Sequence, residues 1–418
     1  MVKTDEGRWN FMGQPSRQDW ERFQAYATRV RRLDFKDFGK HTSKYRNRSL
    51  PLAEIPTLIA AKDLEDEPLL PNVKAITWSV VADIANLPRI LPFISPSLKS
   101  LAFDVYTSEF EEDGDPTRQL FDGLTASPGL DLESFNFEKP EIGAEIVKRL
   151  LSFLERQPKL KVFGLSSDPY LEPRTVQSML FSQLPTGLRE LSADVEFHDE
   201  SEYTALIQTI LKRLPDLRVL KLVLTSHHDS WNLSDFKSFS PLLQNPNLEE
   251  MTLYVSGDIH LDTRDIYALG KALPLMTQFD LRLHYSSLPA LKIQASSLMD
   301  FAKAFPNLRV LTTDISCTDI PLASIEGDKS AEPDAPNLSN LRILNVGASS
   351  LSQDDVTRMA KFLAMLGPGP LLEIEYDGKK KDSGDSVRPW RDVEAMLKLI
   401  RRPNLGGGTL NADRTPSR

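Results

Sequence analysis

Histidines are the residues of this 418-residue chain whose type and spacing come closest to a metal site. Five of the six fall within one stretch, at His198, His227, His228, His260 and His284. Imidazoles that meet at one edge of a fold could bind a metal ion. Because no close histidine or carboxylate pair at helical spacing accompanies them, we interpret them as polar loop residues, with a metal-dependent enzyme as the alternative.

The other candidates for chemistry are weaker. The only cysteine, Cys317, fits a turn or core thiol better than a nucleophile, and it cannot form an internal disulfide. The acidic segment around Asp113 and Asp115 lacks the regularly spaced ligands of a calcium loop. Phosphate loops, dinucleotide fingerprints and hydrolase elbows do not occur. We therefore predict no catalytic residues, no metal, no cofactor and no enzymatic activity.

Charge is distributed unevenly. Residues 1–50 contain 12 Lys/Arg and 6 Asp/Glu, a net charge of +6. Because the whole chain has a net charge of −9, the residues after 50 carry −15. The basic residues of this segment that could meet phosphates are Arg29, Arg31, Arg32, Lys36, Lys40, Lys44, Arg46 and Arg48. The acidic body argues against a nucleic-acid partner. The lack of a long apolar run or signal peptide, together with the single cysteine, predicts an intracellular protein of cytoplasm or nucleus without membrane contact.

One short pattern organises the chain: Leu-x-x-Leu-x-Leu, sometimes with an aromatic or β-branched residue in place of Leu. Twelve copies begin at Val30, Val73, Leu98, Leu132, Leu160, Leu188, Leu217, Leu248, Met276, Leu308, Leu341 and Leu371. From Leu132 onward the spacing is 28 to 33 residues. Alternation in the second half of each copy predicts a strand with one buried face.

The spacers between these strands predict helices. Apolar residues recur three or four apart in Glu141–Arg156, Tyr203–Leu214 and Asp354–Leu366, and a proline or glycine follows each segment. One strand and one helix cannot bury their apolar faces alone, so neighbouring units must stack. We predict an α/β solenoid over residues 30–377, forming one elongated domain instead of the two or three that length suggests.

The ends of the solenoid need caps. Ser16 could start a helix in residues 1–29, whose apolar stripe of Trp20, Phe23, Tyr26, Ala27 and Val30 would cover the first strand. At the other end, Trp390–Ile400 within residues 378–401 predicts a second capping helix, and residues 402–418 a disordered tail.

The repeated residues resemble the leucine-rich-repeat family. This resemblance implies a horseshoe with parallel strands on its concave face and helices on its convex face. The family's usual Asn or Cys after the last Leu is largely replaced, for example by Tyr106, Thr225, Ser316 and Ser349. We therefore expect unequal repeats.

A second, narrower resemblance lies near the start. Asp19–Leu33, with its Trp-x-Arg-Phe, Tyr-Ala and Arg-Val-Arg residues, is similar to the stretch after the F-box in fungal, basidiomycete-type F-box/leucine-rich-repeat proteins. It implies the substrate-recognition subunit of an SCF-type ubiquitin ligase, bound to a Skp-type adaptor if an F-box lies upstream. The F-box itself is not visible in Met1–Pro15. A free-standing scaffold or inhibitor without a ubiquitin role is the alternative.

The third, fifth and seventh motif positions should face outward from the strands and hold a protein partner. The candidate residues are Asp104, Glu138, Asp194, Lys221, Val223, Thr252, Tyr254, Asp280, Arg282 and Asp314. Carboxylates there would steer a basic partner, while the apolar and aromatic residues Val219, Val223, Tyr254 and Tyr285 would anchor it. An acidic face that serves only solubility is the alternative.

Overall fold

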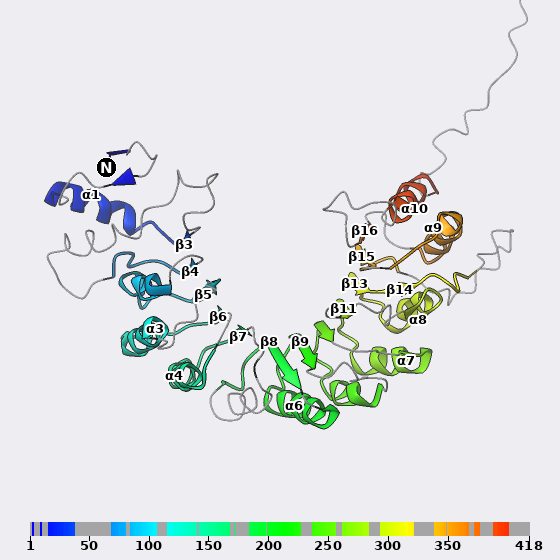
Figure 1. Ribbon diagram of the computed structural model, residues 1–418, viewed down its shortest axis with the longest axis horizontal. Helices are drawn as coiled ribbons and strands as arrows, with labels where there is room; N and C mark the ends of the chain where they lie inside the picture. Colours follow the sequence, from blue (N-terminus) through cyan, green and yellow to red (C-terminus); the bar gives the residue numbers. More distant parts are fainter. Residues whose placement is uncertain are drawn as a thin grey trace, which may run out of the picture. The chain divides into compact units, whose positions relative to one another are not determined.

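The computed structural model (Figure 1) contains two compact units, Met1–Gly257 (unit 1) and Asp258–Arg418 (unit 2), which we describe separately. The described residues are 2–3, 9–10, 16–37, 68–80, 84–106, 115–139, 142–167, 171, 184–197, 199–226, 236–255, 261–283, 293–321, 338–347, 349–367, 372–376 and 388–400.

Unit 1 contains eight neighbouring parallel strands that follow one another in sequence order. They are β3 (Arg32–Asp37), β4 (Ala75–Val80), β5 (Ser100–Val105), β6 (Ser134–Lys139), β7 (Val162–Ser167), β8 (Glu190–Phe197), β9 (Val219–Ser226) and β10 (Glu250–Val255). The helical elements are α1 (Arg17–Ala27), η2 (Ile84–Phe93), α3 (Asp115–Ala126), α4 (Ala144–Leu154), α6 (Glu200–Arg213) and η3 (Phe236–Gln244). A small antiparallel pair, β1 (Val2–Lys3) and β2 (Trp9–Asn10), precedes α1.

Unit 2 repeats the plan with four parallel strands in sequence order. They are β11 (Gln278–Leu283), β13 (Val310–Thr313), β15 (Ile343–Asn345) and β16 (Glu373–Glu375). Its helical elements are α7 (Thr263–Ala272), α8 (Ser297–Ala304), η4 (Gln353–Asp355), α9 (Val356–Met365) and α10 (Arg388–Ile400). A second parallel pair joins β12 (Ile293–Gln294) to β14 (Ile315–Ser316).

Each of the twelve motif copies coincides with one of these twelve parallel strands, so the predicted alternation of parallel strands and helices is confirmed within each unit. The reason is the alternation of side chains along the strand. In β9, Leu220, Leu222 and Leu224 are fully buried, and burying each such side chain contributes roughly 2 kcal/mol. Helices cover this buried face (Figure 1). We call the opposite face of the unit 1 sheet the open face.

Two of the spacers between strands form 3₁₀ helices instead of the predicted α-helices. The elements η2 and η3 are 3₁₀ helices, and they contain Pro88, Pro92 and Pro241. Proline lacks the N–H that an α-helical turn needs and clashes with the preceding turn, so the tighter 3₁₀ geometry forms instead. The predicted helices at α4, α6 and α9 are confirmed within a few residues at their ends.

The two terminal helices are built differently. Ser16 caps α1 through a reciprocal capping box with Asp19, as the sequence predicts. The predicted apolar stripe is wrong at Tyr26, which is 68% exposed, and only Ala27 in it is fully buried. In α10 the Trp390 ring is buried, and its indole Nε1 donates a 2.9 Å hydrogen bond to the Ser349 carbonyl.

Side-chain amides connect successive repeats at the turn before the strand. The Nδ2 groups of Asn247, Asn307 and Asn340 donate to the carbonyls of Pro215, Pro274 and Pro306 in the preceding repeats, over 3.2, 3.3 and 2.9 Å. Each such bond satisfies a turn carbonyl. Within the described ranges, no helix combines the length and apolar character needed to cross a lipid bilayer.

Candidate protein-binding surface

Strand register places the seventh motif positions of unit 1 in one row across the open face. The first part of the row runs over neighbouring strands from Lys36 through Ser79, Asp104 and Glu138 to Ser166. In the second part, Asp194 pairs with Val223, and Val223 pairs with Tyr254. A hydrogen bond from the Ser166 hydroxyl to Asp194 joins the two halves of this row. We call its carboxylates, Asp104, Glu138 and Asp194, the acidic row.

Hydroxyl groups hold the acidic row in place. The Ser79 hydroxyl donates to Asp104 Oδ2 over 2.8 Å, and the Ser166 hydroxyl donates to Asp194. The Tyr106 hydroxyl donates to Glu138. The carboxylates are therefore oriented by neutral donors, and no cation pairs with the row among these contacts.

Partial burial, more than the proximity of the carboxylates, raises the pKa values of Glu138 and Asp194 in the acidic row. Partial burial raises the pKa of Glu138 above its usual value, and the charges of Asp104 and then Asp194 raise it further. Burial also raises the pKa of Asp194, against the hydrogen bond from Ser166. Partial burial and the nearby carboxylates raise the pKa of the Tyr106 hydroxyl. The row is a concentrated negative charge that a cation would stabilise.

Apolar surface continues the row beyond its acidic part. Val223 and Tyr254 are half-buried neighbours on β9 and β10, and Val223 lies beside Asp194. Lys221, the fifth motif position of β9, lies two residues before Val223. It forms a 3.1 Å ion pair with Glu190, so its charge is already neutralised. The surface thus offers negative charge over β5–β8 and a tyrosine and a valine over β9 and β10.

A glycine interrupts the neighbouring row of fifth positions. Gly164 lies between Asn136 and Ser192 in the register, and a Cβ at this position would collide with Asn136 Oδ1. The Asn136 amide occupies the room that a larger residue would need.

The remaining predicted residues are placed elsewhere. Thr252 is only 9% exposed and Asp280 only 6% exposed, so neither offers much for a partner to touch. Arg282 binds Asp280 over 3.0 Å on β11. Asp314, which follows β13, lies against Gly347. Asp280, Arg282 and Asp314 belong to unit 2, and Tyr285 lies outside the described residues.

Most of the residues considered for other chemistry lie in parts of the chain that the structure does not describe. All six histidines lie outside the described residues, as do Lys40, Lys44, Arg46, Arg48 and Asp113. Among the described side chains, no group of three or more His, Cys, Asp or Glu is arranged to hold a metal ion. Cys317 is half-buried, and its thiol faces the Ile315 carbonyl at 3.9 Å.

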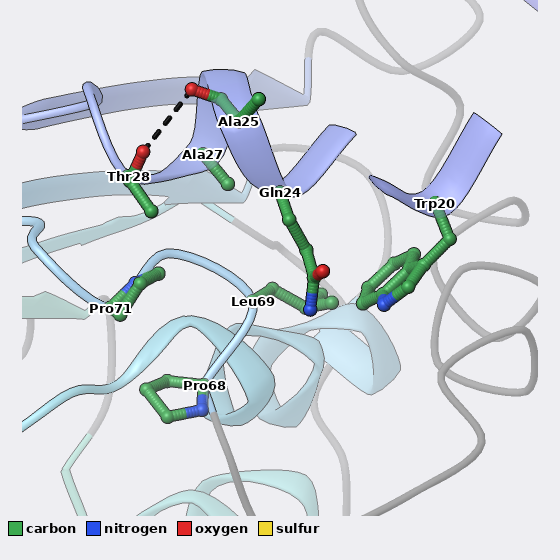
Figure 2. A pocket seen from close by; sticks show the side chains of 8 residues that line it. All are labelled: Trp20, Gln24, Ala25, Ala27, Thr28, Pro68, Leu69 and Pro71. Carbon is green, nitrogen blue, oxygen red and sulfur yellow. Dashed lines mark hydrogen bonds between the residues drawn. The ribbon is translucent and has the colours of Figure 1, made fainter. Parts of the chain in front are cut away.

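A pocket of about 300 Å³ lies beneath α1 (Figure 2). Its lining residues are Trp20, Gln24, Ala25, Ala27, Thr28, Pro68, Leu69 and Pro71. The Thr28 hydroxyl donates to the Ala25 carbonyl over 3.1 Å, and the Asn72 amide donates to the Thr28 carbonyl over 2.9 Å. None of the lining side chains carries a charge, so acid–base chemistry has no source here.

Three polar side chains complete this surface: Ser79 and Tyr106, which the sequence did not single out, and Ser166, which the sequence placed in the row of seventh positions without its contact to Asp194. Two of them were visible as the seventh positions of their strands, and Tyr106 follows the seventh position of β5. Only the strand register showed that each lies next to a carboxylate.

Comparisons with known proteins add no relative: no protein-family model matches this sequence, and no curated protein matches it significantly.

Proposed function

We propose that the chain is an intracellular leucine-rich-repeat protein that binds another protein on the open face of unit 1 and has no catalytic step of its own. The single observation that carries this proposal is the line from Asp104 to Tyr254, joined by the strand register and by the Ser166–Asp194 hydrogen bond, with negative charge at one end and apolar side chains at the other. The horseshoe geometry of that family would make this face concave, as the repeat spacing suggests.

The chemistry of this line indicates a basic partner. The field of Asp104, Glu138 and Asp194 would attract a partner protein that presents lysine or arginine side chains to them. This attraction would raise the association rate and orient the partner on the surface. Partly exposed aromatic side chains supply most of the binding free energy in typical interfaces, so Tyr254 is the anchor in this proposal.

A comparison of two triple variants tests this function. Asp104→Asn, Glu138→Gln and Asp194→Asn remove the charges with little change in shape. Glu21→Gln, Glu155→Gln and Asp354→Asn, all exposed and none of them on a strand, make the matched control. Proteins captured by the wild-type chain and quantified by mass spectrometry should be lost with the first variant and kept with the second. Equal recovery with all three proteins contradicts the proposal.

The finer proposal is that the chain is the substrate-recognition subunit of an SCF-type ubiquitin ligase. It is supported by the resemblance of Asp19–Leu33 to the stretch after a fungal F-box, and this segment forms α1 and the start of β3. Co-precipitation of the full-length product with the Skp-type adaptor of its own cell is the test. Recovery of a partner without the adaptor would indicate a free-standing scaffold or inhibitor.

A further inference from the structure

A second charged line runs along the edge of the unit 1 sheet where the strands begin. The second motif residue of each repeat donates its backbone N–H to the carbonyl of its counterpart in the preceding repeat: Lys74 to Arg31 (2.7 Å), Lys99 to Lys74 (2.9 Å), and so on through Glu133, Lys161, Arg189, Arg218 and Glu249. This backbone ladder fixes the residues side by side. Six of the eight are basic, and we call Arg31, Lys74, Lys99, Lys161, Arg189 and Arg218 the basic row.

The basic row is only partly neutralised by the protein itself. Glu133 pairs with Lys161 over 2.7 Å, and Glu249 pairs with Arg218 over 2.9 Å. Within the part of the chain that the structure describes, no carboxylate lies within ion-pair distance of the other four members, Arg31, Lys74, Lys99 and Arg189. Three of these four are exposed, and Lys99 is half-buried.

This arrangement works against stability. Arg31, Lys74 and Lys99 belong to three neighbouring strands, and like charges directly opposite each other across strands are destabilising. The chain as a whole has a net charge of −9, so the row runs against the general composition. A negative group from outside would remove the repulsion between these three residues.

We propose that the basic row binds an acidic, Asp/Glu-containing segment of a protein partner. The row spans roughly 30 Å, from six steps of about 4.8 Å between Arg31 and Arg218, which an extended segment of about ten residues covers. A polypeptide can place carboxylates opposite Arg31, Lys74, Lys99 and Arg189 and leave neutral residues opposite Glu133. A nucleic acid carries a phosphate at every nucleotide, so Glu133 and Glu249, which interrupt the row, would repel it.

The test measures binding of a fluorescein-labelled ten-residue peptide of alternating Glu and Ser to the full chain, by fluorescence anisotropy at low salt. Lys74→Glu with Lys99→Glu should weaken binding about tenfold or more, because two attractive contacts become repulsive. The matched control, Lys148→Glu with Lys361→Glu, changes the same charge on exposed positions of α4 and α9 and should stay within about twofold. Equal weakening in both variants overturns the proposal.

Two further measurements complete the test. Arg189→Glu, near the other end of the row, should weaken peptide binding about threefold, and it keeps the test available if the double variant fails to fold. Tighter binding of a ten-residue oligothymidylate, lost in the same variants, would overturn the proposal in favour of nucleic acid. The variant Asp104→Asn/Glu138→Gln/Asp194→Asn should bind the acidic peptide as well as the wild type does, which separates this inference from the proposed function.

Discussion

Replacing Glu138 with Gln should stabilise the protein at neutral pH, although it removes a hydrogen-bonded side chain. Glu138 lies opposite Asp104 in the register of β5 and β6, and Asp194 lies two strands further along. Glutamine keeps an oxygen that can accept the Tyr106 hydroxyl hydrogen bond. The substitution therefore removes repulsion while it preserves the contact.

The size of the gain follows from the strand spacing. Residues directly opposite in neighbouring strands place their charges roughly 6 Å apart, where two unit charges in water repel by about 0.7 kcal/mol. Asp194, at about 10 Å, lies beyond the Debye length of about 8 Å in physiological salt and adds little. We expect a gain of about 0.5–1 kcal/mol, or a rise in Tm of about 1–4 °C.

The pH dependence gives the sign. The folded-state pKa of Glu138 is raised above its ordinary value, so the folded protein holds this proton more tightly than the unfolded chain does. Wild-type stability therefore falls as the pH rises through the interval between the unfolded and folded pKa values. The advantage of Glu138→Gln should be complete above that interval and should vanish below the unfolded pKa, near 4.5.

Differential scanning calorimetry at pH 7 and pH 4 provides the measurement. Glu21→Gln in α1 is the control and should change the free energy of unfolding by less than about 0.5 kcal/mol at either pH. The same gain at both pH values would show that the effect is not electrostatic. A loss of stability at pH 7 would refute the repulsion argued for the acidic row.

Three further substitutions probe the packing of unit 2, each by urea denaturation. Trp390→Phe removes the indole donor to the Ser349 carbonyl and part of a buried ring, and should cost about 1–3 kcal/mol. Gly347→Ala introduces a Cβ at a φ of +54° and against Asp314, and should cost at least about 1 kcal/mol, whereas Ser350→Ala nearby should be almost neutral. Asn340→Ala breaks the 2.9 Å bond to the Pro306 carbonyl, and should cost about 0.5–1 kcal/mol; no change would show that water replaces the amide.

The strands were predictable because their signal is strong and local. Side-chain alternation has a period of two, so Leu101, Phe103 and Val105 define the buried face of β5 without any knowledge of its neighbours. The same regularity predicted that Asp104 and Glu138 occupy equivalent positions. Their direct pairing then follows from the parallel register, which places seventh positions side by side.

The features that were missed depend on tertiary contacts or on local backbone chemistry. Ser166 and Asp194 are seventh positions of neighbouring motif copies, so the repeat brings them close, but the hydrogen bond between them depends on side-chain orientations that the sequence does not give. The 3₁₀ helices could have been foreseen from Pro88 and Pro92, since proline withholds a helical N–H. The amide contacts of Asn307 and Asn340 also had a signal, an Asn directly before the first Leu of the motif.

The same repeat that builds the core also explains why the charged rows can differ so sharply. Core positions such as Leu220 and Leu222 are apolar in almost every unit, with the buried Thr313 as an exception, whereas the second and seventh positions lie mostly at the surface and vary. These two positions are five residues apart, roughly 16 Å along a strand, which is about twice the Debye length at physiological salt. The basic row and the acidic row therefore act on separate charged groups of whatever they bind. A partner that engaged both would need an acidic and a basic segment about 16 Å apart, a stricter requirement than either row imposes alone.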